Sequence, residues 1–406
     1  MNPPSARQRV AAAAAGLLTA AGFLAVSAAT ASAATASAGT GTAAVRASAP
    51  QAALRVQQIL SGKRLRHFFP VPGSSRAHSE ALTNPDDLTS LGRYLFTAFQ
   101  NGVGPQGQAS PDGNRYSTIV QLRPDGHPLR QWDILGKCDG LTADPATRRI
   151  IATVNEDAHS SVYTIAPLAP AGEQVQHFRY SVPLPSKGGT DAISVYRGQV
   201  LISASAPGTT GAAAPQPGYP AVYQVRFEPA IDVAVVRPLF SDEAKATVAN
   251  VGSHGKTVRL ALTDPDSNAV VPAWARRFAG DFELTSQGDK EQIFSRPGRS
   301  SGLQVLRLSQ SVDDTAWAST GHGRLYATST GGDTVDLVTG RFSPGSVLVA
   351  VTPCDANGAP ATCPGPGFPA NYLGSLNPWT GHISRVPVHG AALQPQGLLF
   401  LGGPRR

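Results

Sequence analysis

The sequence has few charged residues and few cysteines. Only 15% of its 406 residues are Asp, Glu, Lys or Arg, whereas Gly occurs 42 times and Pro 34 times. This composition is typical of short strands joined by many turns and argues against long surface helices. Beyond the first fifty residues, no apolar run is long enough to cross a bilayer as a helix. We therefore expect an all-β protein without stable membrane insertion in its mature form.

Several catalytic and binding signatures are also missing. The chain has no HExxH metal motif, no G-x-S-x-G nucleophile elbow and no glycine-rich loop that could cradle a phosphate. Its formal net charge is +7, but the basic residues are scattered and are not interleaved with aromatic side chains. Nucleic-acid binding needs such residues on one face, so we expect no nucleic-acid partner. The sequence likewise offers no identifiable base for a nucleophilic serine.

Only three cysteines occur, and two of them predict a disulfide. Cys354 and Cys363 flank DANGAPAT, a turn-rich segment, and are the natural pair in an exported protein. Cys138 is left over. It can be a buried small apolar side chain or a reactive thiol, and the sequence leaves both interpretations open.

The first fifty residues are typical of an export signal. Arg7 and Arg9 precede an uncharged apolar stretch over residues 10–29, and the small residues that follow offer cleavage sites after Ala33 or Ala38. An uncleaved membrane anchor is the alternative, although the Ala, Gly, Ser and Thr content would make it a poor anchor. We therefore expect a secreted protein. Its expected parts are a signal peptide over 1–33, a disordered Ala/Ser/Thr-rich leader over 34–53 and a folded domain over 54–406.

A repeated pattern organises the folded domain. Five segments begin with a polar residue, continue as a short apolar strand, turn at Gly or Arg and end with a second apolar strand. The first two are NPDDLTSLGRYLFTAFQNG and KCDGLTADPATRRIIATVNED, and a sixth segment, LQPQGLLFLGG, keeps only the first strand. The leading polar residues of the six segments are Asp86, Asp139, Asp191, Asn250, Asp313 and Gln396. The first two intervals between them are 53 and 52 residues, and later intervals are longer.

The two chain ends complete each other in this pattern. Strand–turn–strand hairpins lie between the segments, and another, LRVQQILSGKRLRHFF, precedes the first segment without a leading strand of its own. The final PQGLLFL is a leading strand with no hairpin after it. A ring of four-stranded blades closes when both chain ends contribute to one blade, which removes the unpaired edges. We predict a six-bladed β-propeller closed by N- and C-terminal strands that share one blade; two packed β-sandwiches are the alternative.

The segments CDGLTAD and LQPQGLLFL resemble the blade-opening motif of NHL-repeat propellers. Most of the mature chain resembles the six-bladed superfamily that contains gluconolactonase and regucalcin-like lactonases. This resemblance implies a lactonase- or esterase-like activity with a bound cation. The lactonases of that superfamily hold the ion with a Glu from the first blade and with Asn and Asp from later blades. Here Asn84-Pro85-Asp86 stands where that Glu is wanted, so Asn155 and the leading Asp residues remain the candidate ligands.

The leading polar residues should meet near one mouth of the propeller, because the first strand of every blade lines the central channel. Several carboxylates in one channel repel one another and need a cation, hydrogen-bond donors or a raised pKa. Carboxylate and amide oxygens suit a hard divalent cation such as Ca²⁺. The predicted metal ligands are Asp86, Asp139, Asp191, Asp313, Asn250 and Asn155. We expect Asp191 and Asp313 to be catalytic, with an Asp that does not bind the ion acting as general base.

Each Asp can instead accept a backbone N–H at its own turn and have no chemical role. These alternatives lead to two functions. The first is a secreted, divalent-cation-dependent hydrolase that acts on a lactone or an ester. The second is a non-catalytic module that binds a glycan, a peptide or a protein. In both cases we expect a monomer that meets a small-molecule or extracellular ligand.

Overall fold

The computed structural model describes residues 53–71, 77–184, 189–205, 218–298, 302–365 and 370–403. The chain divides into two compact units, Met1–Ala49 and Pro50–Arg406, and all described residues belong to the second. The expected signal peptide lies outside the described residues, as does the expected leader apart from Ala53.

Strands make up nearly all of the regular structure in the described ranges. The exceptions are two single-turn 3₁₀ helices, η1 (Gly62–Arg64) and η2 (Thr330–Gly332). The expected all-β class is therefore confirmed. Within the same ranges, no helix has the length and apolar character that crossing a membrane requires.

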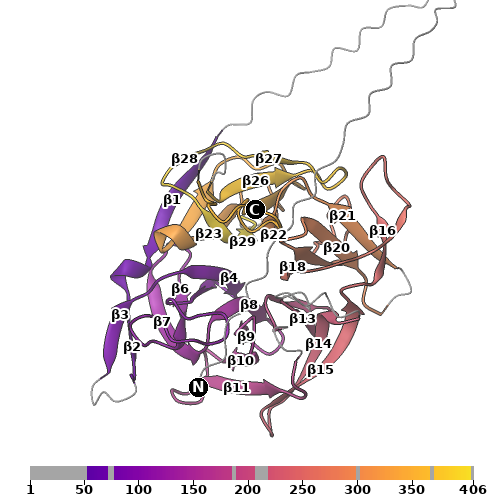
Figure 1. The fold of residues 1–406 in the computed structure, drawn as a ribbon. Coiled ribbons are helices and arrows are strands. Elements are labelled where there is room, and N and C mark those ends of the chain that lie inside the picture. Colours follow the sequence, from indigo (N-terminus) through magenta and orange to yellow (C-terminus); the bar gives the residue numbers. More distant parts are fainter. Residues whose placement is uncertain are drawn as a thin grey trace, which may run out of the picture. The chain divides into compact units, whose positions relative to one another are not determined.

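Many strands belong to antiparallel units of four that follow the chain order (Figure 1). The first unit consists of β4 (Pro85–Leu91), β5 (Tyr94–Phe99), β6 (Tyr116–Leu122) and β7 (Pro128–Leu135). The second consists of β8 (Cys138–Asp144), β9 (Arg149–Val154), β10 (Ser161–Ile165) and β11 (Val175–Tyr180). The third consists of β12 (Ile193–Tyr196), β13 (Gln199–Ser203), β14 (Pro220–Glu228) and β15 (Val233–Ser241). Because β11 and β15 pair in parallel, the second and third units form one eight-stranded sheet.

Two further units follow along the chain. One consists of β18 (Pro265–Val270), β19 (Phe282–Ser286), β20 (Glu291–Ser295) and β21 (Leu303–Arg307). A hairpin of β16 (Lys245–Val248) and β17 (Thr257–Arg259) extends it, because β16 pairs in parallel with β21. The other consists of β22 (Val312–Trp317), β25 (Val347–Val351), β26 (Tyr372–Leu376) and β27 (Ile383–Arg385).

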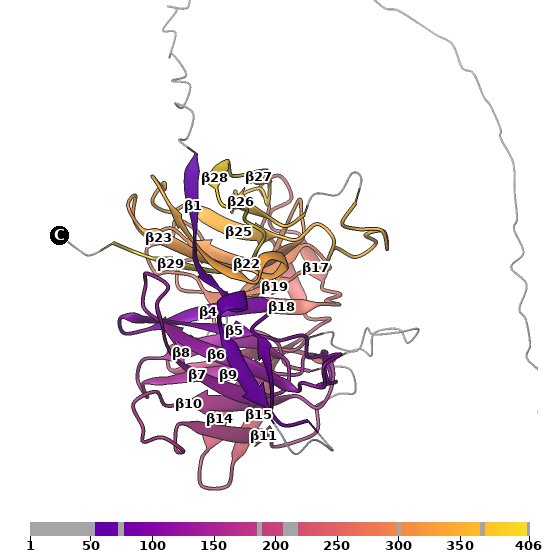
Figure 2. The same cartoon turned by 90° about the vertical axis from the view of Figure 1, so that its left-hand side faces the viewer.

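Strands from both ends of the described chain share the remaining large sheet. Its order is β28 (Val388–Gly390), β1 (Leu54–Ser61), β24 (Thr334–Thr339), β23 (Arg324–Ser329) and β29 (Pro395–Leu401). Figure 2 shows β1 in this sheet from the side, near β23 and β29. A separate two-stranded hairpin is formed by β2 (Arg66–Phe69) and β3 (His78–Ala81).

The first strands of these units lie next to one another in series. β4 contacts β8, β8 contacts β12, and the series continues through β18, β22 and β29 back to β4 (Figure 1). Sheets that meet along their first strands in this way form a propeller-like arrangement. The end of each first strand therefore faces a shared central space.

Two of the expected repeats are assembled differently from the prediction. The segment led by Asp313 contains two strands, Val312–Trp317 and Arg324–Ser329, which the repeat pattern would pair with each other. Instead, β23 pairs with β24 and β29, and β25 takes the place beside β22. The reason is that the first strand of the terminal sheet is β29, near the C-terminus. The next two strands of that sheet, β23 and β24, come from the segment before β25. The segment that Asn250 was expected to lead also differs, because Asn250 lies in the turn of the edge hairpin β16–β17, whereas β18 is the first strand of that unit.

The apolar core lies between neighbouring sheets. In one cluster, Phe96 and Ile119 of the first unit are packed with Ile150 and Ala152 of the second. Sheets covered on both faces bury both sides of their middle strands, so these strands are apolar without alternation, as in VLVAV of β25. The outer strand β7 instead alternates between buried and exposed residues over its second half.

Carboxylates tie neighbouring first strands together. Asp87 Oδ2 accepts the backbone N–H of Leu141 at 2.7 Å, which links β4 to β8. Asp314 Oδ2 accepts the backbone N–H of Leu398 at 2.7 Å, which links β22 to β29. Both bonds satisfy N–H groups in the crowded centre of the structure, where an unpaired donor would be destabilising.

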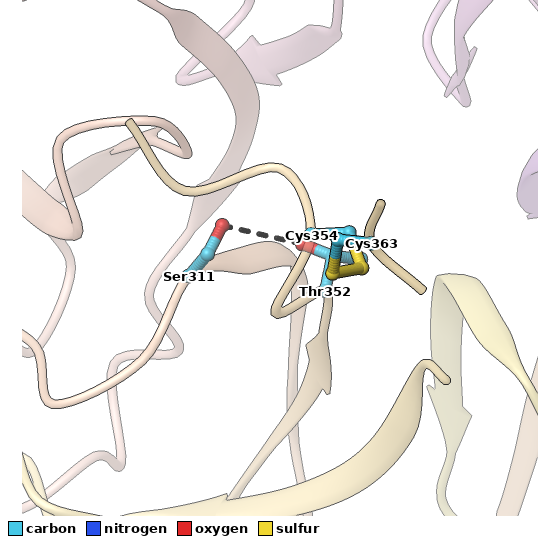
Figure 3. Close-up of a disulfide and its surroundings, with 4 residues drawn as sticks. All are labelled: Ser311, Thr352, Cys354 and Cys363. Carbon is cyan, nitrogen blue, oxygen red and sulfur yellow. Dashed lines mark hydrogen bonds between the residues drawn. A yellow bond between two sulfur atoms is a disulfide. The ribbon is translucent and has the colours of Figure 1, made fainter. Parts of the chain in front are cut away.

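The predicted disulfide between Cys354 and Cys363 is present, with the two Cα atoms 5.4 Å apart (Figure 3). It closes the loop that follows β25. At the start of this loop the hydroxyl of Thr352 lies 3.3 Å from that of Ser311. Cys138 is free and buried, and burial raises the pKa of its thiol well above the usual range. The interpretation of Cys138 as a buried apolar side chain is therefore the one that the structure supports.

We expect Asp314→Ala to lower the free energy of unfolding by about 1–3 kcal/mol, because the N–H of Leu398 loses its acceptor while it stays buried. Asp314→Asn should cost less, since the amide oxygen can still accept one bond. Urea unfolding of both variants measures the difference. Asp112→Ala, at an exposed position, is the control. Equal stability of Asp314→Ala and the wild type would show that this bond does not hold the two strands together.

Candidate functional site

A cavity of about 550 Å³ lies where the first strands converge. Each of β4, β8, β12, β18, β22 and β29 contributes residues to its wall. The acidic residues of the wall are Asp86, Asp87, Asp139, Glu156, Asp191, Asp266, Asp313 and Asp314. Lys137 is the one basic residue among the described residues that line it. The cavity is therefore an acidic site within a chain of net positive charge.

A β-bulge places the acidic side chains in this cavity. On β4, Asp86 and Asp87 together oppose one residue of β5, because the pairing passes from Pro85 to Leu88. The same shift of register occurs on β8, β18 and β22, and where β29 meets β23. Bulges bend a strand and redirect its side chains. The first residues of the five bulged pairs are Asp86, Asp139, Asp266, Asp313 and Gln396, and all of them line the cavity.

Hydroxyl groups fix the backbone at these positions. Thr153, on the strand next to β8, donates to the carbonyl oxygen of Asp191, which directly precedes β12. Thr328, on the strand next to β29, donates to the carbonyl oxygen of Asp86 in the following unit. Each hydroxyl thus joins one unit to the next at an acidic residue. The carboxylates therefore project from a backbone that both neighbouring units hold in place.

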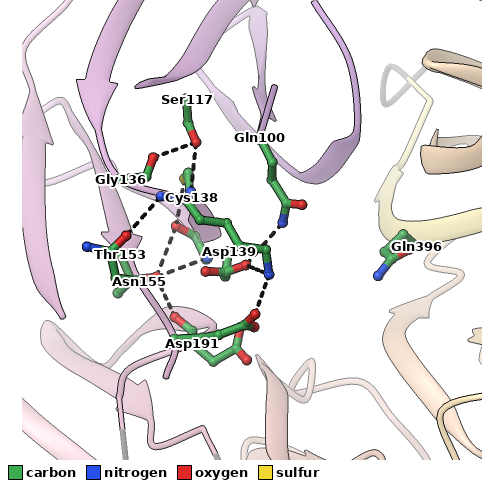
Figure 4. Close-up of polar contacts among 12 residues, drawn as sticks. Gln100, Ser117, Gly136, Cys138, Asp139, Thr153, Asn155, Asp191 and Gln396 are labelled. Carbon is green, nitrogen blue, oxygen red and sulfur yellow. Dashed lines mark hydrogen bonds and ion pairs between the residues drawn. The ribbon is translucent and has the colours of Figure 1, made fainter. Parts of the chain in front are cut away.

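Three carboxylates lie close enough to hold a metal ion together. Asp139, Glu156 and Asp191 each offer an oxygen atom, and these three atoms lie within 4.8 Å of one another. Gln100 Nε2 donates to Asp139 Oδ1 at 3.0 Å, whereas Asp139 Oδ2 is buried and has no hydrogen-bond partner. Figure 4 shows Asp139 and Asp191 on one side of this space and Gln396 on the other. We call Asp139, Glu156 and Asp191 the acidic triad.

Lys137 lies against the acidic triad. Its Nζ atom is 2.5 Å from Asp139 Oδ1 and also pairs with Glu156 Oε1. Burial by itself lowers the pKa of Lys137, but the charges of Asp139 and Glu156 outweigh this effect and raise it well above the usual range. The ammonium group therefore stays charged and compensates part of the negative charge in the cavity.

Burial raises the pKa of the Asp carboxyls in the cavity. The pKa of Asp86 rises to about 8 because the carboxyl is removed from water, and Asp87 and Glu156 add to the rise while Lys137 opposes it. The pKa values of four further carboxyls are raised well above the usual range by burial first and by neighbouring carboxylates second. These residues are Asp139, Asp191, Asp266 and Asp313. Protons or a bound cation must therefore neutralise part of this set near neutral pH.

The opposite side of the cavity carries Asp266 and Asp313. Asp266 Oδ2 is buried without a hydrogen-bond partner. Asp313 Oδ2 lies 3.4 Å from Gln287 Nε2, and that amide also donates to Thr352 Oγ1 at 3.0 Å. Thr352 begins the disulfide loop, so this loop reaches the cavity through Gln287.

The structure therefore brings four of the six predicted ligands into one cavity. These are Asp86, Asp139, Asp191 and Asp313. Asn250 does not line it, because Asn250 lies in the turn of the outer hairpin β16–β17, and its side-chain amide bonds to the carbonyl oxygens of Arg307 and Thr380. Asn155 does not line it either, because its side chain accepts the N–H of Lys137 and donates to the carbonyl oxygen of His159. The expectation that Asn250 and Asn155 meet the four Asp residues in this cavity is therefore corrected, because the structure places neither side chain in the wall.

Three residues of the site, Lys137, Glu156 and Asp266, are not among the predicted ligands. A signal for Asp266 was present, because Asp264-Pro265-Asp266-Ser267 repeats the pattern of the segment Asn-Pro-Asp-Asp that ends in Asp87. No local pattern marks Lys137 or Glu156. Their side chains meet because β8 and β9 are adjacent, which brings the residues just before and just after these strands together.

Comparison with known proteins gives no assignment from sequence: no family model and no curated protein matches the chain. Solved structures with a similar arrangement of strands include the periplasmic gluconolactonase of Pseudomonas aeruginosa, with 14% identity and a TM-score of 0.42 over 86% of this chain and 99% of that one. A proposed 6-phosphogluconolactonase from Bacteroides uniformis has 12% identity and a TM-score of 0.43, over 86% and 100%. Streptogramin B lyase has 10% identity and a TM-score of 0.37, over 82% and 90%. At these values none of them assigns a family or an activity to this chain.

We expect the protein to lose stability as the pH rises from about 4 to about 8 in the absence of divalent cations. Asp86 has a folded-state pKa of about 8 against an ordinary value of 3.8, so in this window the folded chain binds a proton that the unfolded chain has lost. This group alone should lower the free energy of unfolding by about 1 kcal/mol per pH unit. Denaturant unfolding at several pH values in the presence of a chelator measures the slope.

Asp86→Asn should flatten this dependence, because the amide does not titrate, and Asp112→Asn should leave it unchanged. A stability that is constant or rises between these pH values would contradict the burial of uncompensated carboxyls in the cavity.

Proposed function

We propose that the propeller-like arrangement is a closed ring of six blades over residues 54–406. Support comes from the series of six first strands, β4, β8, β12, β18, β22 and β29, each of which begins an antiparallel set of four strands. The shared sheet of β1 and β29 supports closure by the two chain ends. A ring of this kind explains why residues from all parts of the chain meet in one cavity.

The cavity is proposed as the active site of a divalent-cation-dependent hydrolase that acts on a lactone or an ester. The observation that carries this proposal is the acidic triad with its buried, unpartnered oxygen, Asp139 Oδ2. A buried carboxylate oxygen without a partner is destabilising unless a ligand satisfies it. A set of carboxylate oxygens is the donor set that Ca²⁺ prefers, so the residues fit this ion.

Asp139, Glu156 and Asp191 would hold the ion, and Gln100 would fix the orientation of Asp139 through its bond to Oδ1. When bound, such an ion polarises a carbonyl group and lowers the pKa of water. Asp313 belongs to β22, which lies across the series of first strands from β8. Its raised pKa makes its carboxylate a stronger base than an ordinary Asp, which suits it to accept a proton from attacking water. Gln287 is placed to orient Asp313.

The proposal includes export and a monomeric state in which the protein meets a small-molecule or extracellular ligand. The disulfide between Cys354 and Cys363 is compatible with an oxidising compartment. The segment expected to direct export, residues 1–33, carries the basic start and small-residue cleavage sites that export requires.

A binding module without chemistry is the second candidate, and Lys137 favours it. Lys137 pairs with Asp139 and Glu156, so a positive charge from the protein itself already lies against the acidic triad. The cavity can then persist without an ion and without turnover. Calcium-dependent melting without hydrolysis of any lactone or ester would favour this candidate over the hydrolase.

Asp191→Asn and Asp313→Asn should each lower kcat on a panel of lactones and aryl esters by at least about 100-fold, the contribution expected of an ion ligand or a general base. Both variants should keep the fold, since an amide of nearly the same size replaces the carboxyl and removes one member of a set of buried carboxylates that repel one another. Asp112→Asn is the matched control at an exposed site. Wild-type turnover in both folded variants would refute the hydrolase.

Elemental analysis should find about one equivalent of a divalent cation in protein purified with Ca²⁺ present. A chelator should lower the melting temperature, because it removes a ligand that binds only the folded chain. Protein that contains no ion, and melts at the same temperature with and without chelator, would eliminate the ion from the proposal.

A further inference from the structure

The ammonium group of Lys137 lies where a cation bound by the acidic triad would have to lie. It is 2.5 Å from Asp139 Oδ1 and pairs with Glu156 Oε1, and thereby contacts two of the three carboxylates that could hold an ion. The second oxygen of Asp139, Oδ2, has no hydrogen-bond partner although Asp139 is only 5% exposed. Lys137 thus occupies the place of a cation at the acidic triad but leaves one buried carboxylate oxygen without a partner.

The backbone of Lys137 is fixed while its charge is carried on a long side chain. Its N–H donates to Asn155 Oδ1 at 3.0 Å, directly before β8 begins. The side chain is 17% exposed, so it reaches the edge of the cavity. A lysine ammonium sits on a flexible four-carbon stem and can move without any change in the backbone.

We propose that Lys137 is a tethered counter-cation that competes with a divalent ion for the acidic triad, so that the ion binds only when the ammonium group leaves Asp139 and Glu156. This inference rests on the proposed cation site. Two cations against the same carboxylates repel one another strongly in a cavity of low dielectric, so they do not share the triad. A tethered group acts at a high effective concentration, which a free ion must overcome.

This competition gives Lys137 a regulatory role. Without the ion, its charge holds the acidic triad together and prevents mutual repulsion of the carboxylates. With the ion, the ammonium group is released toward the open part of the cavity. Occupancy of the site by the ion therefore sets the position of the one basic side chain that the described wall contains.

The first test measures the affinity for Ca²⁺ by calorimetry in wild type, Lys137→Met and Lys256→Met. Lys256 is exposed in the turn between β16 and β17 and does not line the cavity, so its variant controls for the loss of one positive charge. Lys137→Met should bind Ca²⁺ at least about tenfold more tightly than wild type, because the competitor is gone. Lys256→Met should bind as wild type does.

The second test uses the wild-type chain and does not depend on the folding of a variant. Lysines are labelled by reductive methylation with and without Ca²⁺, and the extent at each position is read by mass spectrometry. Lys137 should be labelled faster with Ca²⁺ present, because its ammonium group has left the carboxylates. Lys256 is the internal control and should be unaffected. This readout separates displacement from a simple effect of charge on affinity.

The outcomes distinguish this inference from the proposed hydrolase. Equal affinity in wild type and Lys137→Met, or labelling of Lys137 that ignores Ca²⁺, overturns the competition and leaves the hydrolase standing. Binding by Lys137→Met alone supports the competition and removes ion-dependent turnover from the wild type. Absence of binding in all three proteins overturns the inference, because the triad is then no cation site.

Discussion

The site depends on one backbone feature, the bulge that opens most of the first strands. Where a regular ladder would turn successive side chains to opposite faces, the bulged pairs on β4 and β22 send their first side chain into the cavity, and their second side chain accepts a backbone N–H from a neighbouring strand. Asp86 and Asp87 illustrate this division of roles: the first lines the cavity with a raised pKa, and the second accepts the N–H of Leu141. The close approach of the carboxylates and the hydrogen bonds between neighbouring first strands therefore have the same origin. A change that straightens the bulge should disturb both.

The sequence contained much of this arrangement. The leading residues Asp86, Asp139, Asp191 and Asp313 were found because a polar residue before a short apolar strand recurs at regular intervals, and such a pattern survives insertions in loops. Asn250 was chosen wrongly because the edge hairpin β16–β17 has the same strand–turn–strand form as a true repeat, and a local pattern does not reveal which strand is central. The extended pattern of Asp264 to Ser267 was the better guide to the fourth position.

Some strand pairings and side-chain contacts could not be predicted from short sequence patterns, for a physical reason. β23 pairs with β24 and β29, and not with β22, because strands from both ends of the described chain share one sheet. Such sharing depends on the whole chain and not on a short segment. The contacts of Lys137 with Asp139 and Glu156 depend on the twist of one strand pair and on the space left by the other units. The residue types predicted an acidic centre. The role of Lys137, whose ammonium group partly neutralises that centre, could be recognised only in the three-dimensional structure.

The parallel pairing of β11 with β15 has a consequence for the rigidity of the acidic triad. It pairs Arg179 and Tyr180 with Val233 and Ala234, so strand pairing joins the second and third units into one continuous sheet. The acidic triad comes entirely from these two joined units, whereas Asp266 and Asp313 belong to units whose sheets stay separate. Because one continuous sheet carries all three carboxylates of the acidic triad, their spacing should not depend on how the separate sheets of the other units move.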